Sequence, residues 1–171
     1  MILVRHAESE WNRHFSRTRV DPGIPDPPLT RAGRRQAARL IDRLARADIR
    51  RLVASPYRRT LETAAIVGNA LGLAITVEPL IRERCVFSCD EGTPAAQLAA
   101  LWPDLDFAHL EERWWGVAAE SEVSLGRRCA AFRAKADTLP DRSQIAVITH
   151  WGVIRALTGE ELSNADCIRL I

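Results

Sequence analysis

Met1-Ile2-Leu3-Val4-Arg5-His6 opens the chain with four apolar residues, followed by a cation and an imidazole. Four apolar residues in a row are typical of a short strand buried in a sheet. In open α/β sheets, ligands bind outside the carboxyl ends of the strands. The sequence therefore predicts a sheet whose first strand presents Arg5 and His6 to a ligand.

Two later stretches repeat this pattern of a buried strand that ends on polar residues. Residues 144–149 form a largely apolar run directly before His150. Residues 51–54, which are apolar after Arg51, stand directly before Ser55, with Arg58 close behind. Ligand sites in parallel sheets collect at the edge where the strands end. We therefore expect two histidines, a serine and two arginines to converge, and we interpret them as a pocket for a phosphoryl group.

Helical and strand patterns alternate along the rest of the chain. Thr30 is a predicted N-cap, and apolar residues at spacings of three and four follow it as far as Leu44. A strand, a helix and a second strand in this order favour parallel pairing, so the sequence indicates an α/β fold. Further helices are expected at residues 56–71, 94–102, 121–139 and 151–157, and further strands at residues 74–77 and 166–171, with a loop at residues 79–93.

The segment of residues 13–28 is expected to be irregular. Its prolines, which begin at Pro22, exclude a long helix or an inner strand there. The segment also carries several basic residues, and two interpretations stay open. It is either a lid over the pocket that begins at His6 or a solvated connector.

Length and composition restrict the class of protein. The chain has 171 residues, 47% of them hydrophobic, which suits a single domain spanning residues 1–171. A net charge of +2 gives no general electrostatic case for nucleic acid, and no apolar run is long enough for a membrane span. The four cysteines form no CxxC pair, and a strand begins where a secretory signal would stand. We therefore expect a cytoplasmic protein with reduced cysteines.

The helix predicted at residues 56–71 carries two adjacent arginines at its start. Arg58 stands three residues before the apolar Leu61, and residues three apart lie on the same side of a helix. The spacing therefore places Arg58 on the buried side. The same spacing turns Arg59 away, where it can pair with Glu62. Arg58 is therefore the preferred phosphate ligand.

These residue types fit phosphoryl transfer through histidine. A neutral imidazole can attack phosphorus, and flanking arginines disfavour its charged form while neutralising the phosphoryl oxygens. A carboxylic acid must then protonate the leaving oxygen and later activate water, and no metal or other cofactor is required. Spacing alone selects neither the attacking histidine nor the acid, whose candidates are Glu8, Glu10, Glu83 and Glu91.

Four blocks of sequence carry a family resemblance. Residues 5–12 (RHAESEWN) resemble the RHGES-x-WN signature of the histidine phosphatase superfamily, in its phosphoglycerate mutase-like branch. Residues 28–37 resemble its PLT-x-x-G-x-x-QA block, and residues 149–155 its closing SHGG-x-x-R block. Ser55-Pro56-x-Arg58, with Thr63-Ala64, resembles S-P-x-x-R-A-x-x-T-A. The blocks occur in family order and run nearly end to end.

The resemblance implies a fold and a set of roles. The fold would be a three-layer α/β/α sandwich with a mostly parallel central sheet. His6 would be the phosphorylated nucleophile and Glu83 the proton donor. The residues that would hold the phosphoryl group or line its pocket are Arg5, Ser9, Asn12, Arg58 and His150.

Departures from the family pattern bear on the activity. Ala7 and Trp151 stand where glycine is usual, and Arg59 is interpreted as replacing an alanine. The chain between Glu83 and His150 is short, whereas the true mutases carry longer basic insertions there. The resemblance therefore favours a phosphatase acting on a small phosphorylated substrate, as a monomer or homodimer. The alternatives are a phosphoglycerate mutase, a protein phosphatase for phosphohistidine or phosphoserine, and a non-catalytic phospho-ligand binding module.

Overall fold

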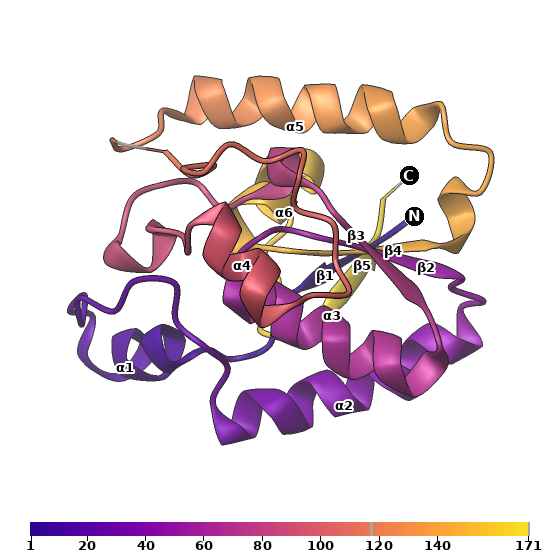
Figure 1. Ribbon diagram of the computed structural model, residues 1–171, viewed down its shortest axis with the longest axis horizontal. Helices are drawn as coiled ribbons and strands as arrows, with labels where there is room; N and C mark the ends of the chain where they lie inside the picture. Colours follow the sequence, from indigo (N-terminus) through magenta and orange to yellow (C-terminus); the bar gives the residue numbers. More distant parts are fainter. Residues whose placement is uncertain (117, 171) are drawn as a thin grey trace.

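A five-stranded sheet runs through the middle of the molecule (Figure 1). The computed structural model describes residues 1–116 and 118–170. The strand order is β3-β2-β4-β1-β5, in which β5 alone pairs antiparallel. The strands are β1 (Ile2–Arg5), β2 (Arg51–Ala54), β3 (Ala74–Val77), β4 (Ile145–Thr149) and β5 (Cys167–Arg169). Ile171, the last residue of the strand predicted at 166–171, lies outside the described residues.

Helices cover both faces of the sheet, so the predicted three-layer α/β/α sandwich is confirmed (Figure 1). One layer holds α2 (Arg31–Arg46) and α3 (Arg58–Leu71), and the other holds α5 (Glu122–Asp137) and α6 (Trp151–Thr158). The shorter elements are α1 (Glu10–Thr18), α4 (Ala95–Leu101) and the 3-10 turns η1 (Pro79–Ile81), η2 (Ser88–Asp90) and η3 (Arg142–Gln144). None of the helices described combines the length and apolar character needed to cross a bilayer.

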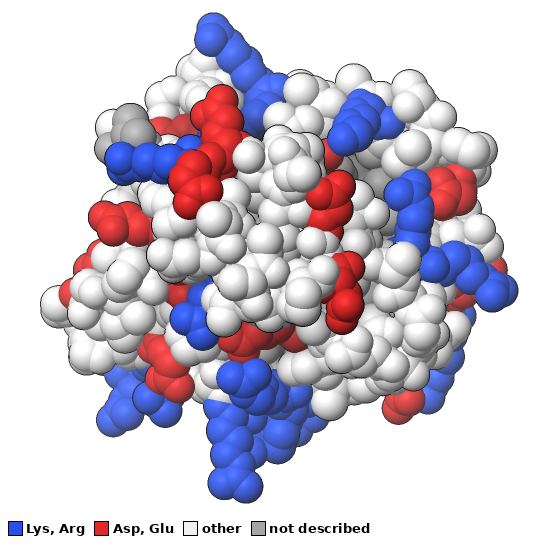
Figure 2. All heavy atoms as spheres, in the orientation of Figure 1, with Lys and Arg blue, Asp and Glu red and all other residues white. Residues whose placement is uncertain are grey.

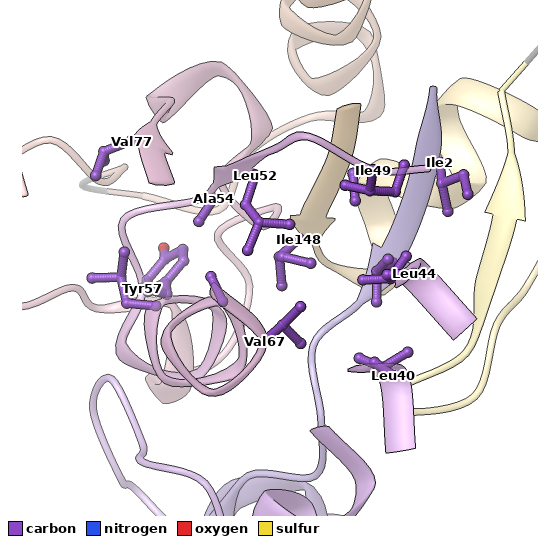
Figure 3. Packing of buried hydrophobic residues seen from close by; sticks show 14 of the residues in the cluster. Ile2, Leu40, Leu44, Ile49, Leu52, Ala54, Tyr57, Val67, Val77 and Ile148 are labelled. Atoms are coloured by element: carbon purple, nitrogen blue, oxygen red, sulfur yellow. The ribbon is translucent and has the colours of Figure 1, made fainter. Parts of the chain in front are cut away.

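The alternation of side chains along each strand divides the core between the two layers. In β4, Ala146 and Ile148 pack with the α2–α3 layer, while Ile145 and Val147 pack with the α5–α6 layer. Figure 3 shows the first of these two clusters, with Ile148 among side chains of the α2–α3 layer such as Val67. A strand buried on both faces needs a continuous apolar run, and this is the pattern that the sequence displays.

Helix α2 begins and faces the core as the sequence predicts. The Thr30 hydroxyl accepts a hydrogen bond from the Gly33 N–H at 2.8 Å and caps the helix. Ala37, Leu40 and Leu44 are buried, while the arginines of this helix lie on its outer side. Figure 2 shows basic side chains gathered along the edge where Figure 1 places α2, with acidic and basic side chains scattered over the rest of that face.

The expectation that residues 13–28 are irregular is wrong for the first part of the segment. Helix α1 continues to Thr18, because Ser9 and Asn12 form a reciprocal capping box that starts it. The prolines begin only at Pro22, beyond the end of the helix, so they do not oppose it. The irregular backbone is restricted to the residues between α1 and α2.

Strands β1 and β4 lie side by side where the chain changes direction. Arg5 stands opposite Thr149 in the parallel register. The chain leaves β1 toward the α2–α3 layer and leaves β4 toward the α5–α6 layer. Such a switch point opens a crevice beyond the strand ends, and ligands bind there in α/β sheets.

Candidate active site

The two histidines meet beyond the ends of β1 and β4, as the sequence predicts. The His6 backbone N–H donates to the Thr149 carbonyl at 2.9 Å, which ties the two strand ends together. The ring centroids of His6 and His150 lie 5.2 Å apart, with an angle of 62° between the ring planes. Both side chains are buried.

The hydrogen bonds of the two rings define which nitrogens are available. Nδ1 of His6 lies 2.8 Å from the Ala7 carbonyl oxygen, which can only accept, so Nδ1 carries the proton and Nε2 keeps its lone pair. Nε2 of His150 lies 2.8 Å from the Ser55 hydroxyl, whereas its Nδ1 has no hydrogen-bond partner among the described residues. Burial, together with the nearby Arg59 guanidinium, holds the pKa of both imidazoles well below the ordinary value. His6 is therefore neutral at physiological pH and carries a lone pair for attack.

Two guanidinium groups line the cavity next to the histidines. Arg5 donates from Nη1 to the Leu162 carbonyl at 2.6 Å. The Arg59 side chain is buried and donates to the Cys89 carbonyl at 2.7 Å and to the Asp90 carboxylate at 3.2 Å. Both cations are held by fixed partners, so a phosphoryl group would find them already oriented.

The interpretation that Arg58 faces the site and Arg59 turns away is wrong. Arg58 does not line the cavity; its side chain is 37% exposed, and its Nη2 lies 3.9 Å from the Glu62 carboxylate. Helix α3 begins at Arg58, two residues later than expected, because the backbone of the buried Tyr57 is extended. Arg59 then lies one turn before Thr63, whose hydroxyl accepts from the Ala7 N–H at 3.1 Å, so this side of the helix faces the end of β1.

The sequence contains a signal that identifies Arg59. In the pattern S-P-x-x-R-A-x-x-T-A, counting from Ser55 places the arginine at position 59 and the alanine at position 60. Arg59 therefore occupies the arginine position of the motif, and Thr60 replaces the alanine. Arg58 as a phosphate ligand stays a prediction that its placement disfavours.

Ser9 and Asn12 line the same cavity, at the start of α1. The Asn12 amide oxygen accepts from the Ser9 N–H at 3.2 Å and from the Asn164 amide at 3.2 Å. Asn164 also donates to the His6 carbonyl at 3.0 Å, so it joins α1 to the end of β1. Sequence reasoning missed Asn164, because nothing near position 164 in the chain marks it.

Glu83 lies at the wall of the cavity, against the first turn of α6. Its carboxylate accepts from the Arg84 N–H at 2.9 Å and from the Gly152 N–H at 3.2 Å. A Cβ atom added at Gly152 would lie 2.5 Å from Oε1 of Glu83, so only glycine permits this approach. Burial raises the pKa of the Glu83 carboxyl, and the nearby Asp90 carboxylate raises it further. A raised pKa makes this carboxyl a better candidate for a general acid than an ordinary glutamate.

Asp90 is a second site residue that sequence reasoning missed. Besides its ion pair with Arg59, its carboxylate accepts from the N–H groups of Val86 and Phe87, both at 3.0 Å. The side chain is buried and lines the cavity. Its partner Arg59 is 31 positions away in the chain, so no local pattern predicts the pair.

The residues described above surround one cavity of about 840 Å³. Its polar end holds His6, Arg5, Arg59 and Glu83, and His150 lies behind His6 without reaching the cavity surface. The arrangement offers a nucleophilic nitrogen, two fixed cations and a carboxyl group with a raised pKa. This combination matches the requirements of phosphoryl transfer without a metal.

With the three-layer fold and the paired histidines described, the chain can be compared with known families. A family model described as the histidine phosphatase superfamily (branch 1) matches residues 1–166. The chain therefore belongs to the histidine phosphatase superfamily, and the resemblance stated from its motifs is confirmed.

Similar proteins carry two kinds of name. A Proteus mirabilis relative named "Probable phosphoglycerate mutase GpmB" is 38% identical over 162 residues, which cover 88% of this chain and 68% of the relative. A Yersinia enterocolitica relative of the same name is 29% identical over 161 residues, with the same coverage of both chains.

Among solved structures, a mycobacterial glucosyl-3-phosphoglycerate phosphatase in complex with VO3 superposes with a TM-score of 0.70 at 22% identity, covering 98% of this chain and 88% of the other. Bacillus stearothermophilus YhfR gives a TM-score of 0.62 at 23% identity, covering 92% and 77%. At these identities the structural likeness establishes the fold alone. The two sets of names leave phosphatase and mutase activity to be decided by the chemistry of the site.

Proposed function

We propose that this protein is a metal-independent phosphatase that hydrolyses small phosphomonoesters through a phosphohistidine at His6. One observation carries the proposal. The bond from Nδ1 of His6 to the Ala7 carbonyl leaves Nε2 as a free nucleophile, in a cavity that also contains Arg5 and Arg59. The low pKa of the imidazole keeps that nucleophile unprotonated.

In the first step, Nε2 of His6 attacks phosphorus while the bond from phosphorus to the ester oxygen breaks. Glu83, in its protonated form, gives its proton to the departing oxygen, so the alcohol leaves neutral and Glu83 becomes a carboxylate. Arg5 and Arg59 neutralise the phosphoryl oxygens as charge moves onto them. His150 is buried beside His6 and does not line the cavity, so its donation to the phosphoryl oxygens stays a prediction.

In the second step, the Glu83 carboxylate takes a proton from a water molecule as the water oxygen attacks phosphorus. The N–P bond breaks, His6 regains its neutral imidazole, and inorganic phosphate leaves. Glu83 is again protonated, so the cycle needs no further acid or base. The raised pKa of this carboxyl supports both roles.

The second candidate is a phosphoglycerate mutase, which the names of the sequence relatives favour. A mutase returns the phosphoryl group to another hydroxyl of the same alcohol, whereas a phosphatase passes it to water. Both use the same first step, so the fate of the phosphoryl group distinguishes them. We favour the phosphatase because the stretch between Glu83 and His150 is short, whereas the true mutases carry longer basic insertions there.

The test follows the phosphoryl group. The protein is mixed with a ³²P-labelled phosphomonoester and quenched, and the label is located by its stability in alkali, its loss in acid and peptide mapping. We expect label on His6, none in His6→Ala, and full labelling in His14→Ala, whose imidazole is exposed on α1. Label on a serine or carboxylate, or equal labelling of His6→Ala, would contradict the proposal. Conversion of 3-phosphoglycerate to its isomer, dependent on a bisphosphoglycerate primer and without free phosphate, would identify a mutase.

A further inference from the structure

The outer part of the cavity differs in character from its polar end. Trp11 and Phe15 of α1 and Phe87, just before η2, all line it. The ring centroids of Trp11 and Phe15 lie 4.4 Å apart, with the planes nearly parallel. Phe87 approaches them at 5.1 Å and 5.3 Å. These three side chains, the aromatic cluster, form an apolar wall that continues from the phosphoryl end.

The aromatic cluster is fixed before any ligand binds. The Trp11 indole N–H donates to the Asp21 carboxylate at 2.9 Å, and the same carboxylate accepts from the Ser88 N–H at 2.8 Å. Asp21 therefore joins α1 to the segment that carries Phe87. A wall that is already ordered loses little conformational entropy when a ligand packs against it.

Another aromatic residue, Trp151, contributes to the same cavity from α6. Two of the cations at this end stack on rings. Arg155 lies 5.4 Å from the Trp151 ring centroid, and Arg19 lies 5.9 Å from that of Phe15. The Arg84 side chain, which also lines the cavity, is paired with Glu122. The outer cavity thus offers ring faces and stacked or paired cations.

The size of the cavity leaves room for a ligand larger than phosphate. Its volume of about 840 Å³ lies within the range of pockets that enclose ligands of drug size. A phosphoryl group bound between Arg5 and Arg59 occupies only the polar end. The space along the aromatic cluster is then available to the alcohol part of a phosphomonoester.

We infer that the aromatic cluster and Trp151 form a subsite for an aromatic ring in the alcohol part of the substrate. The preferred substrates are phosphomonoesters whose alcohol carries such a ring, in place of compact esters with a second anionic group. An aromatic ring of a substrate packs favourably against ring faces, whereas a carboxylate there would lose its hydration against apolar walls. This inference rests on the proposed phosphatase activity and names the substrate class of the same site.

The test compares 2-phenylethyl phosphate with ethyl phosphate. Both release a primary alcohol, so the bond that breaks is closely similar and the ring is the main difference. We expect kcat/KM for the phenylethyl ester to exceed that for the ethyl ester by at least about tenfold, as a hydrophobic pocket distinguishes substrates that differ in apolar size. 3-Phosphoglycerate is expected to react more slowly than the phenylethyl ester.

Two variants and a control test whether the aromatic cluster and Trp151 cause the preference for the phenylethyl ester. Phe87→Ala should lower the ratio of the two kcat/KM values by about two- to tenfold, the range for the loss of one aromatic pair. Trp151→Gly should lower it in the same direction. Leu101→Ala, which removes a 57% exposed apolar side chain of α4 that does not line the cavity, should leave the ratio unchanged.

The outcomes separate the inference from the function on which it rests. Equal kcat/KM values for the two esters, or a preference for 3-phosphoglycerate, would overturn the aromatic subsite while phosphate release still supports a phosphatase. A ratio that survives both Phe87→Ala and Trp151→Gly would also overturn it. Failure to release phosphate from any ester would overturn the proposed function and the inference with it.

Discussion

Replacing each of the two neighbouring arginines at the start of α3 tests the assignment of the site most directly. The Arg59 guanidinium is buried between the Cys89 carbonyl and the Asp90 carboxylate, next to the histidines. Loss of one positioned donor to a developing anion typically costs about 10²- to 10³-fold in kcat. We therefore expect Arg59→Gln to lower kcat/KM for phosphate release by at least about 10²-fold.

Arg59→Gln also removes the partner of a buried carboxylate. Breaking a buried ion pair on one side costs about 3–5 kcal/mol of the free energy of unfolding. Asp90 keeps its two backbone N–H donors, at Val86 and Phe87. We therefore expect the free energy of unfolding to fall by about 3 kcal/mol, near the lower end of that range. The double variant Arg59→Gln/Asp90→Asn removes the unpaired charge and should regain stability in urea without regaining activity. This separates the catalytic effect from the structural one.

The matched control is Arg58→Gln. The Arg58 side chain is 37% exposed, and its contact with Glu62 is 3.9 Å long, so its loss should cost less than about 0.5 kcal/mol and change kcat/KM only a few-fold. A larger loss of activity in Arg58→Gln than in Arg59→Gln would refute the assignment. A pH profile adds a second check, because the Arg59 cation lowers the pKa of His6. Arg59→Gln therefore raises the pKa of His6. On acidification, the variant should lose activity at a higher pH than the wild type, because its His6 becomes protonated earlier.

Two further predictions concern Glu83. Glu83→Gln keeps the size of the side chain but has no proton to give, so kcat for alkyl esters should fall by about 10²- to 10⁴-fold. In the wild type, kcat should decline as pH rises through the raised pKa of this carboxyl, because the acid loses its proton. This decline should be absent from the kcat profile of Glu83→Gln, and an unchanged profile would exclude Glu83 as the acid. In Gly152→Ala the new Cβ would lie 2.5 Å from Oε1 of Glu83, so we expect kcat to fall by roughly tenfold as the carboxylate is displaced. Gly126→Ala on α5, where an added Cβ meets nothing within 4 Å, should instead raise the free energy of unfolding by about 0.5–1 kcal/mol and leave kcat unchanged.

The parts of the site that the sequence predicts are those fixed by strand ends. His6 and His150 each stand at the end of a short, largely apolar run that forms a buried strand, and neighbouring parallel strands end at the same edge. The polar residue directly after such a run has little freedom in position. The convergence of these two rings could therefore be predicted although 144 positions separate them in the chain.

The orientation of Arg58 and Arg59 could not be predicted from periodicity. Helix α3 is buried over a wide arc, with Thr60, Leu61, Thr63, Ala64, Val67 and Gly68 all inside. When so much of a helix surface is covered, a step of three back from Leu61 does not distinguish one arginine from the next. The spacing of the family motif contained the answer, since it depends on the backbone turn after Ser55 and not on the apolar stripe.

Helix α1 and Asp90 were missed for different physical reasons. The start of α1 depends on a local capping box, and the prolines from Pro22 onward lie beyond the end of the helix. Asp90 depends on a partner in a distant element, because its burial is tolerated only through Arg59 and two backbone donors. Local sequence patterns indicate helix caps and the apolar sides of helices, whereas a buried ion pair between distant residues depends on the tertiary structure.

The choice between phosphatase and mutase depends on what holds the alcohol while phosphorus is bound to His6. A mutase must retain a phosphoglycerate whose carboxylate needs cations free to bind it. The cations that line this cavity are engaged otherwise: in the proposed mechanism Arg5 and Arg59 bind the phosphoryl oxygens, and Arg84 pairs with Glu122. Arg19 and Arg155 lie over aromatic rings. On the proposed mechanism we expect an alcohol without its own anion to be held by apolar contact and to leave once its bond to phosphorus breaks, so that water reaches the phosphohistidine next to Glu83 and hydrolyses it.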